Sequence, residues 1–196
     1  MNAGNLDNQI FLIINGFVNK VPIFDNFIRL IVNEYFVPVS LALLILYLWF
    51  AKHTQRGKRR QGLSLALFSI GLVNVIIVIL NQFVARARPF DDLDTKLLFY
   101  EPTDPSFPSN AAAVSFALAS AIFFVDKRLG VFALSLATLY SFSRIYAGVH
   151  FPSDVVVGAV IGVSSAFFIS RFPLLIKYLT KFIESVQEKL KLNLDY

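Results

Sequence analysis

The sequence predicts an all-α membrane protein: a polytopic helix bundle of five to six spans, with an additional interfacial helix near the N-terminus. Hydrophobic residues make up 56% of the 196 residues and the mean hydropathy is +0.64, well above the values of soluble domains. Charged residues make up only 16%, and they cluster between long apolar runs. These runs lack the strict alternation that a membrane β-barrel needs, so helices are the structure that satisfies the backbone in lipid.

The N-terminal part predicts helices that lie at the membrane surface. The apolar stretch 8–18 is shorter than the roughly 20 residues that a span requires, and Pro22 interrupts the chain after it. Residues 23–36 mix phenylalanine and isoleucine with acidic and basic residues, the pattern of an interfacial amphipathic helix or of a polar start to the first span. Residues 1–8 contain no positively charged leader, so no cleaved signal peptide is expected.

Five later segments are apolar enough to be membrane spans. They cover residues 35–51, 62–84, 111–125, 129–149 and 154–169. Small residues recur at a spacing of four, as at Gly158 and Gly162, which predicts close packing between helices. We therefore expect one integral membrane domain over residues 1–196, with its core at 35–171.

The charged residues predict which side of the membrane each loop faces. Residues 52–61 form a strongly basic loop, 126–128 are also basic, and 172–196 form a basic amphipathic tail. Under the positive-inside rule these three segments are cytoplasmic. The polar stretch 86–110 and the loop 147–153 then share the outer face of a multi-pass protein of the cell membrane. A basic loop is expected beside a bilayer, so it does not indicate binding to nucleic acid.

The stretch 143–154 carries the densest chemistry. It places Arg144, His150 and Asp154 at the mouth of an apolar segment. A histidine and an aspartate four residues apart can lie close together, so the carboxylate can hold the imidazole in one tautomer, while arginine offers a planar fork of donors for phosphate oxygens. The alternative is a membrane-edge loop with solvated side chains, but polar groups in membrane segments rarely lack a role.

Two more polar clusters lie on the same predicted face. Arg86 and Arg88 follow the span 62–84, and another span begins after Ser109 and Asn110, so its free N–H groups form a potential anion site. Each arginine alone could instead extend toward lipid headgroups. Three arginines, a helix N-terminus and a histidine–aspartate pair together predict a held phosphoryl group whose charge the arginines offset. No acidic or histidine cluster indicates a metal, and no cofactor is expected.

These motifs resemble the signatures of the type 2 phosphatidic acid phosphatase superfamily of integral membrane lipid phosphatases. The family patterns are Lys-x6-Arg-Pro, Pro-Ser-Gly-His and Ser-Arg-x5-His-x3-Asp. The third is complete at residues 143–154, the second is partly kept at 108–110, and the first is kept at 88–89. The Arg-x-Arg-Pro-Phe form and the short chain are most similar to the undecaprenyl-diphosphatase branch. The resemblance covers roughly residues 35–171.

The resemblance implies a mechanism and a substrate class. His150 would attack phosphorus and become a phosphohistidine, and Asp154 would orient it, as expected of an activated nucleophile. The phosphate oxygens would be held by Arg88, Arg144, Ser109 and the amides near Asn110. The substrate would be a polyprenyl (undecaprenyl) diphosphate that loses its terminal phosphate while its apolar chain lies between helices in the bilayer. Phosphatidylglycerophosphate, phosphatidate and lipid A phosphate are alternative substrates, and a non-catalytic binder of phospholipid headgroups is the competing class.

Two positions depart from the family pattern. Asn81 stands where the first motif has lysine, and Arg86 is the candidate to replace that charge. Ala111 stands where the second motif has the histidine that protonates the leaving oxygen. Alanine cannot move a proton, and general acid catalysis is worth about 10²–10⁴ in rate, so we expect strongly impaired turnover. The chain is either a natural pseudo-enzyme or one changed at position 111; the retained His150 and arginines favour the change.

Overall fold

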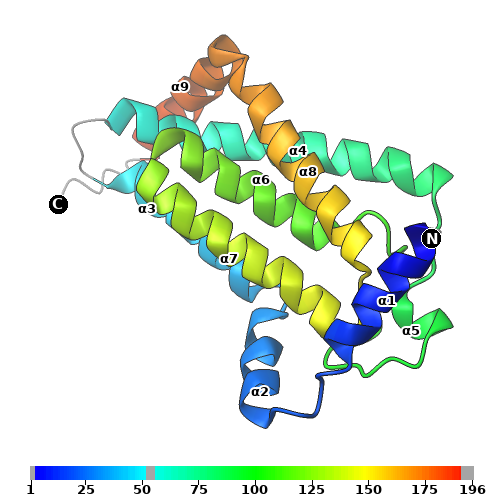
Figure 1. The fold of residues 1–196 in the computed structure, drawn as a ribbon. Coiled ribbons are helices and arrows are strands. Elements are labelled where there is room, and N and C mark those ends of the chain that lie inside the picture. Colours follow the sequence, from blue (N-terminus) through cyan, green and yellow to red (C-terminus); the bar gives the residue numbers. More distant parts are fainter. Residues whose placement is uncertain (1–2, 52–55, 191–196) are drawn as a thin grey trace.

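The computed structural model describes residues 3–51 and 56–190, and its regular structure over those residues is helical (Figure 1). The helices are α1 (Ala3–Asn15), α2 (Pro22–Ile31), α3 (Phe36–Phe50), α4 (Arg56–Phe83), α5 (Pro89–Asp92), α6 (Asn110–Val125), α7 (Lys127–Tyr146), α8 (Pro152–Ser170) and α9 (Pro173–Lys189). Helix α6 lies at the centre and packs against α3, α4, α7 and α8. The predicted all-helical membrane bundle is confirmed.

The described helices differ in how well they suit a membrane span. Gly57–Phe83, Lys127–Tyr146 and Pro152–Ser170 are each long and apolar enough to cross a bilayer. Helices α2 and α3 form a fourth candidate together, bent by 51° at the break between them, and α6 is apolar but shorter. The five predicted segments coincide with α3, α4, α6, α7 and α8. The count of five to six spans, and the single domain with its core at 35–171, stay predictions.

The prediction of a loop over residues 52–61 is wrong for its second half. Helix α4 already includes those residues, while 52–55, with His53, lie outside the described part of the chain. Low hydropathy indicates exposure, but arginine, lysine and glutamine are good helix formers. Arg59 also has a partner there, since its guanidinium lies 2.6 Å from the Asp126 carboxylate.

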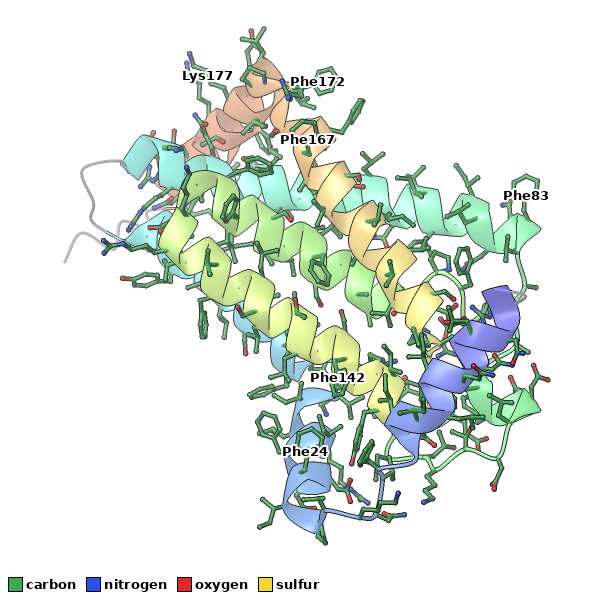
Figure 2. The ribbon with its side chains drawn as sticks, in the orientation of Figure 1. Phe24, Phe83, Phe142, Phe167, Phe172 and Lys177 are labelled. Carbon is green, nitrogen blue, oxygen red and sulfur yellow. The ribbon has the colours of Figure 1, made fainter. Side chains whose placement is uncertain are left out.

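Within the predicted tail, Pro173–Lys189 forms α9, which packs on α4 and α8. The hydroxyl groups of Ser64 and Thr180 are 2.8 Å apart in this contact. Figure 2 shows Phe172 pointing away from the bundle at the corner between α8 and α9, and Phe83 doing so at the end of α4. Exposed aromatic side chains of this kind suit a surface that faces lipid.

Two glycines set the distance between α6 and α8. A Cβ atom on Gly158 would lie 2.4 Å from the carbonyl oxygen of Ser109, and one on Gly162 would lie 2.2 Å from that of Ala113. Both contacts are with backbone, so no side chain fits, and the predicted packing role is confirmed. Because α8 passes so close to the start of α6, the Ser109 N–H donates to the Asp154 carbonyl oxygen at 3.0 Å.

The two ends of the bundle differ. Helix α1 lies across the ends of α7 and α8, and α5 with its flanking loops lies at the same end (Figure 1). Helix α9 and the start of α4 lie at the opposite end. The polar stretch 86–110 and the loop 147–153 are therefore neighbours, as predicted. The assignment of that end to the outside of the cell stays a prediction.

Candidate active site

The predicted polar clusters meet at one cavity of about 340 Å³ at the α5 end of the bundle. Its lining residues are Glu34, Tyr35, Pro38, Arg88, Asp104, Asn110, Ala111, Val114, Tyr140, Arg144 and His150. The positive side chains on this wall are those of Arg88 and Arg144. Over residues 3–51 and 56–190, no group of three or more His, Cys, Asp or Glu side chains could hold a metal ion.

His150 lies in the loop between α7 and α8 and is almost fully buried. Its Nδ1 is 2.9 Å from the carbonyl oxygen of Ser106. A carbonyl oxygen only accepts, so Nδ1 carries the proton and Nε2 presents its lone pair, 3.4 Å from Nη1 of Arg88. Burial lowers the pKa of His150 to about 4, with Arg144 and Arg88 acting in the same direction against Asp154. The imidazole is therefore neutral at neutral pH.

Asp154 is a fully buried carboxylate at the start of α8. Oδ2 accepts the Ser106 hydroxyl at 2.5 Å and the Phe151 N–H at 2.9 Å, and Oδ1 accepts Arg86 Nη1 at 2.7 Å. Oδ2 is 3.8 Å from Nδ1 of His150, beyond hydrogen-bond distance. In this geometry Asp154 acts on the histidine through Ser106. Asp154 binds the Ser106 hydroxyl, and the Ser106 carbonyl accepts the hydrogen bond from Nδ1–H of His150.

Gly148 shapes the turn that presents His150. It has φ +90°, a conformation that side-chain-bearing residues rarely adopt. A Cβ atom there would also lie 2.6 Å from Thr95 Cγ2. The neighbouring backbone is paired, since the Leu98 N–H donates to the Ala147 carbonyl at 3.2 Å. The glycine thus lets the loop after α7 turn tightly against the 95–98 segment.

Arg88 is buried, and its donors are directed by three oxygen atoms on two neighbouring residues. Nη1 donates to the Val149 carbonyl at 2.7 Å, Nε to the Asp104 carbonyl at 2.9 Å, and Nη2 to the Asp104 carboxylate at 2.9 Å. The Asp104 side chain is 62% exposed. A phosphate in the cavity would compete with that exposed carboxylate for Nη2.

Arg144 is also buried, and fewer of its donors are used. Nη1 donates to the Val32 carbonyl at 3.2 Å, while Nη2 lies 4.0 Å from the Glu34 carboxylate. Its buried Nε has no hydrogen-bond partner among the described residues. The guanidinium stacks over Phe99 at 4.6 Å. Burying an unpaired donor on a cation costs free energy, so a bound anion would complete this environment.

Three predicted site residues at the start of α6 differ in whether they line the cavity. Ser109 is the N-cap of α6, and its Oγ accepts the Ala112 N–H at 3.4 Å. It is fully buried, so this hydroxyl caps the helix and does not line the cavity. Asn110 and Ala111 in the first turn do line it. Position 111 therefore faces the same cavity as His150, but with a methyl group that cannot donate a proton.

Arg86 lies outside the cavity, although the sequence places it among the phosphate ligands. Nη1 is 2.7 Å from Oδ1 of Asp154 and Nη2 is 2.7 Å from Oδ2 of Asp7. Its guanidinium covers the Phe151 ring at 3.9 Å. Arg86 is thus paired with carboxylates that it would have to leave to reach phosphate. Asn81 on α4 has a buried side-chain oxygen with no partner among the described residues.

Two of these residues escaped the sequence reasoning. Ser106 belongs to a mixed polar stretch, where nothing distinguishes it from its neighbours. Asp7 had a usable signal, because it is the only charged residue before Lys20 in a largely apolar N-terminal segment. A lone carboxylate in such surroundings needs a partner. The partner itself could be identified only in three dimensions.

Comparison with known proteins agrees with this geometry. Residues 62–177 match the PAP2 superfamily. The undecaprenyl-diphosphatase BcrC of Bacillus subtilis (strain 168) is 28% identical over 184 residues, which cover 93% of this chain and 92% of that protein. A lipid A 4'-phosphatase of Porphyromonas gingivalis is 29% identical over 182 residues, covering 85% of this chain and 72% of that protein.

Two solved structures share the fold. Aquifex aeolicus LpxE superposes with a TM-score of 0.66 at 30% identity, covering 82% of this chain and 92% of that one. A transmembrane PAP2-type phosphatidylglycerolphosphate phosphatase from Bacillus subtilis gives 0.60 at 24% identity, covering 94% and 88%. The matched stretch 62–177 makes up more than half of the chain and includes all three motifs around the cavity. The chain therefore belongs to the PAP2 superfamily.

Proposed function

We propose that this protein is a lipid phosphatase that removes the terminal phosphate of a polyprenyl diphosphate, of the undecaprenyl type, and that Ala111 impairs its turnover. The observation that carries the proposal is the cavity itself. It brings the Nε2 lone pair of His150, the guanidinium groups of Arg88 and Arg144, and position 111 to one cavity. Similarity to an undecaprenyl-diphosphatase over 93% of the chain supports the substrate class.

In the proposed reaction, Nε2 of His150 attacks the terminal phosphorus. A P–N bond forms while the P–O bond to the lipid monophosphate breaks, and the bonding electrons leave with that oxygen. Arg88 and Arg144 offset the charge on the phosphoryl oxygens. The Nδ1 proton stays on the ring, held by the Ser106 carbonyl. Water then attacks the phosphohistidine and releases inorganic phosphate.

The alanine at position 111 favours a diphosphate among the alternative substrates. A diphosphate expels a phosphate monoester anion, which is stable without an added proton. Phosphatidate, phosphatidylglycerophosphate and lipid A phosphate expel an alkoxide, which needs a general acid. Glu34 and Asp104 also line the cavity, but each carboxylate faces an arginine. The substrate that least needs the missing acid is therefore the one we propose.

The proposed site faces the outside of the cell membrane. The basic residues gather at the α9 end, which the positive-inside rule assigns to the cytoplasm. The chain contains no cysteine, so single cysteines at Thr54 and Thr103 can be labelled cleanly with an impermeant thiol reagent on intact cells. We expect labelling at 103 and not at 54; the reverse pattern would overturn this orientation.

The proposed activity is tested by restoring the acid. We expect Ala111→His to raise phosphate release from a polyprenyl diphosphate by at least about 10²-fold. Phosphatidate and phosphatidylglycerophosphate, assayed in parallel, identify the preferred substrate. If Ala111→His hydrolyses no lipid phosphate while the protein still binds vanadate, the phosphatase proposal fails. The protein would then be a binder of phosphorylated headgroups, the function that an alanine at 111 otherwise favours.

A further inference from the structure

Helix α1 precedes the stretch that matches the family, yet one of its side chains reaches the site. Asp7 is nearly buried where α1 crosses the start of α8 (Figure 1). Its Oδ1 accepts the Ser153 N–H at 2.9 Å, and its Oδ2 accepts the Ser153 hydroxyl at 2.5 Å. The same Oδ2 lies 2.7 Å from Nη2 of Arg86. Asp7 therefore binds both the residue before Asp154 and the arginine that pairs with Asp154.

Arg86 bridges two carboxylates. It reaches Asp7 with Nη2 and Asp154 with Nη1, each at 2.7 Å, and Nη1 also contacts the Ser153 hydroxyl at 2.7 Å. The guanidinium carbon lies over the Phe151 ring, 3.9 Å from its centroid, and that ring packs 5.6 Å from the ring of Phe11 on α1. The guanidinium is thus held by a ring contact and by two carboxylates of opposite charge.

Burial alone would raise the pKa of Asp7, but hydrogen bonds from Ser153 and Arg86 outweigh burial and lower it. Asp7 is therefore charged at neutral pH. Without that charge, Arg86 would keep only Asp154 as a carboxylate partner. The attraction between Arg86 and Oδ1 of Asp154 would then no longer be balanced by a second carboxylate.

We propose that Asp7 is a positioning residue for the nucleophile: it holds Nη2 of Arg86 while Asp154 binds Nη1, so that Asp154 stays against Ser106 and Ser106 keeps the proton of His150 on Nδ1. The final link is the 2.9 Å contact between His150 Nδ1 and the Ser106 carbonyl. The Ser106 N–H also donates to the Arg86 carbonyl at 2.9 Å, so the same arginine residue fixes this segment through its backbone. The inference rests on the proposed function only in naming His150 as the nucleophile.

Other contacts keep α1 docked when Asp7 is changed. Asn15 at the end of the helix donates to the carbonyls of Lys96 and Tyr146 at 2.8 and 2.9 Å, and it accepts the Lys96 N–H at 2.9 Å. Phe11, which lies between Asp7 and Asn15 on α1, is fully buried. A change from Asp7 to Asn is nearly isosteric, so it removes the charge while α1 stays in place.

The first test is a double-mutant cycle on turnover in the Ala111→His background. We expect Asp7→Asn to lower kcat about tenfold and to change KM less than about twofold, because substrate contacts are untouched. In an Arg86→Gln background, Asp7→Asn should change kcat less than about twofold, since Asp7 acts through Arg86. The exposed Asp94 provides the matched control, and Asp94→Asn should leave kcat unchanged. The proposal would be overturned if Asp7→Asn lowered kcat by the same factor with and without Arg86→Gln and lowered the melting temperature equally in both backgrounds. Asp7 would then only dock α1.

The second test needs no turnover, so it separates this inference from the proposed function. The chain has two histidines, and His53→Gln leaves His150 as the single imidazole for ¹⁵N NMR. We expect the parent spectrum to show Nδ1 protonated and Nε2 unprotonated, and Asp7→Asn to populate the other tautomer. An unchanged His150 spectrum in Asp7→Asn would overturn the proposal whether or not any lipid phosphate is hydrolysed.

Discussion

The residues around the proposed nucleophile differ from those on the rest of the cavity. His150, Ser106 and Asp154 are almost fully buried and linked by short hydrogen bonds. Elsewhere on the cavity, the Glu34 and Asp104 side chains are 39% and 62% exposed, and Ala111 contributes only a methyl group. A buried hydrogen-bonded cluster loses several contacts when one member changes, whereas an open wall tolerates substitution. We therefore expect the cluster around His150 to stay intact although Ala111 supplies no acid to the cavity.

The largest effect is expected when the proposed nucleophile His150 is removed from a variant that carries a histidine at the acid position, Ala111→His. In the Ala111→His background, we expect His150→Ala to lower phosphate release from a polyprenyl diphosphate by at least about 10³-fold, because the covalent route is lost. A matched His53→Ala variant should keep the activity of its parent. If the His150→Ala protein retains a tenth or more of the rate, another group is the nucleophile.

The two cavity arginines should matter next. We expect Arg88→Ala and Arg144→Ala each to weaken vanadate binding by roughly 10- to 100-fold, since a hydrogen bond to a charged group is worth about 1.5–3 kcal/mol. Isothermal titration of the purified parent and variants measures this, with Arg171→Ala at the far end of α8 as control. The vanadate affinity of Arg144→Lys should lie between those of the parent and Arg144→Ala, because lysine keeps the charge but loses the planar fork of donors. Unchanged affinity in both alanine variants would place the anion elsewhere.

The buried nucleophile side should also make stability depend on pH. His150 has its pKa lowered to about 4, while an unfolded histidine titrates near 6.5. Between these values the unfolded chain binds more protons, so stability falls as pH drops from about 6.5 toward 4, by up to about 1.4 kcal/mol per unit. Denaturation of the detergent-solubilised protein at several pH values tests this.

In a His150→Gln variant this part of the pH dependence should disappear. The difference between parent and variant isolates His150 from the acidic residues that titrate in the same range. Identical slopes in the two proteins would mean that His150 is not held neutral by burial.

The smallest effect is expected from the exposed carboxylate of Asp104. We expect Asp104→Asn to tighten vanadate binding about two- to fivefold, because an exposed carboxylate that competes for Arg88 is worth about 0.2–1 kcal/mol. The gain should be larger at low ionic strength, where charges are less screened. Asp94→Asn is the control of the same charge change at an exposed position. Weaker binding in Asp104→Asn would instead mean that Asp104 holds Arg88 in its binding position.

Much of the fold and part of the site follow from local patterns. Apolar runs of the right length predicted the positions of α3, α4, α6, α7 and α8, since each run must cover its own backbone in lipid. The predicted start of a span after Ser109 and Asn110 also agrees with the structure, where Ser109 caps α6, because a helix start needs a nearby acceptor. The motifs and their shared predicted face indicated that Arg88, Ala111, Arg144 and His150 lie together, and all four line one cavity. The basic segment 52–61 shows the limit, since hydropathy measures exposure and not helix formation.

Tertiary structure alone decided how the polar groups pair. Asp154 reaches His150 through Ser106 and binds Arg86, and Arg86 binds Asp7. These partners are dozens of residues apart in the chain, so no spacing encodes their contacts. Their distances depend on how α1 crosses the bundle and on the close approach of α6 and α8 at Gly158. Hydrogen bonds and ion pairs act over a few ångströms. Side-chain identity therefore determines which pairs are possible, and only the packing of whole helices determines which of them form.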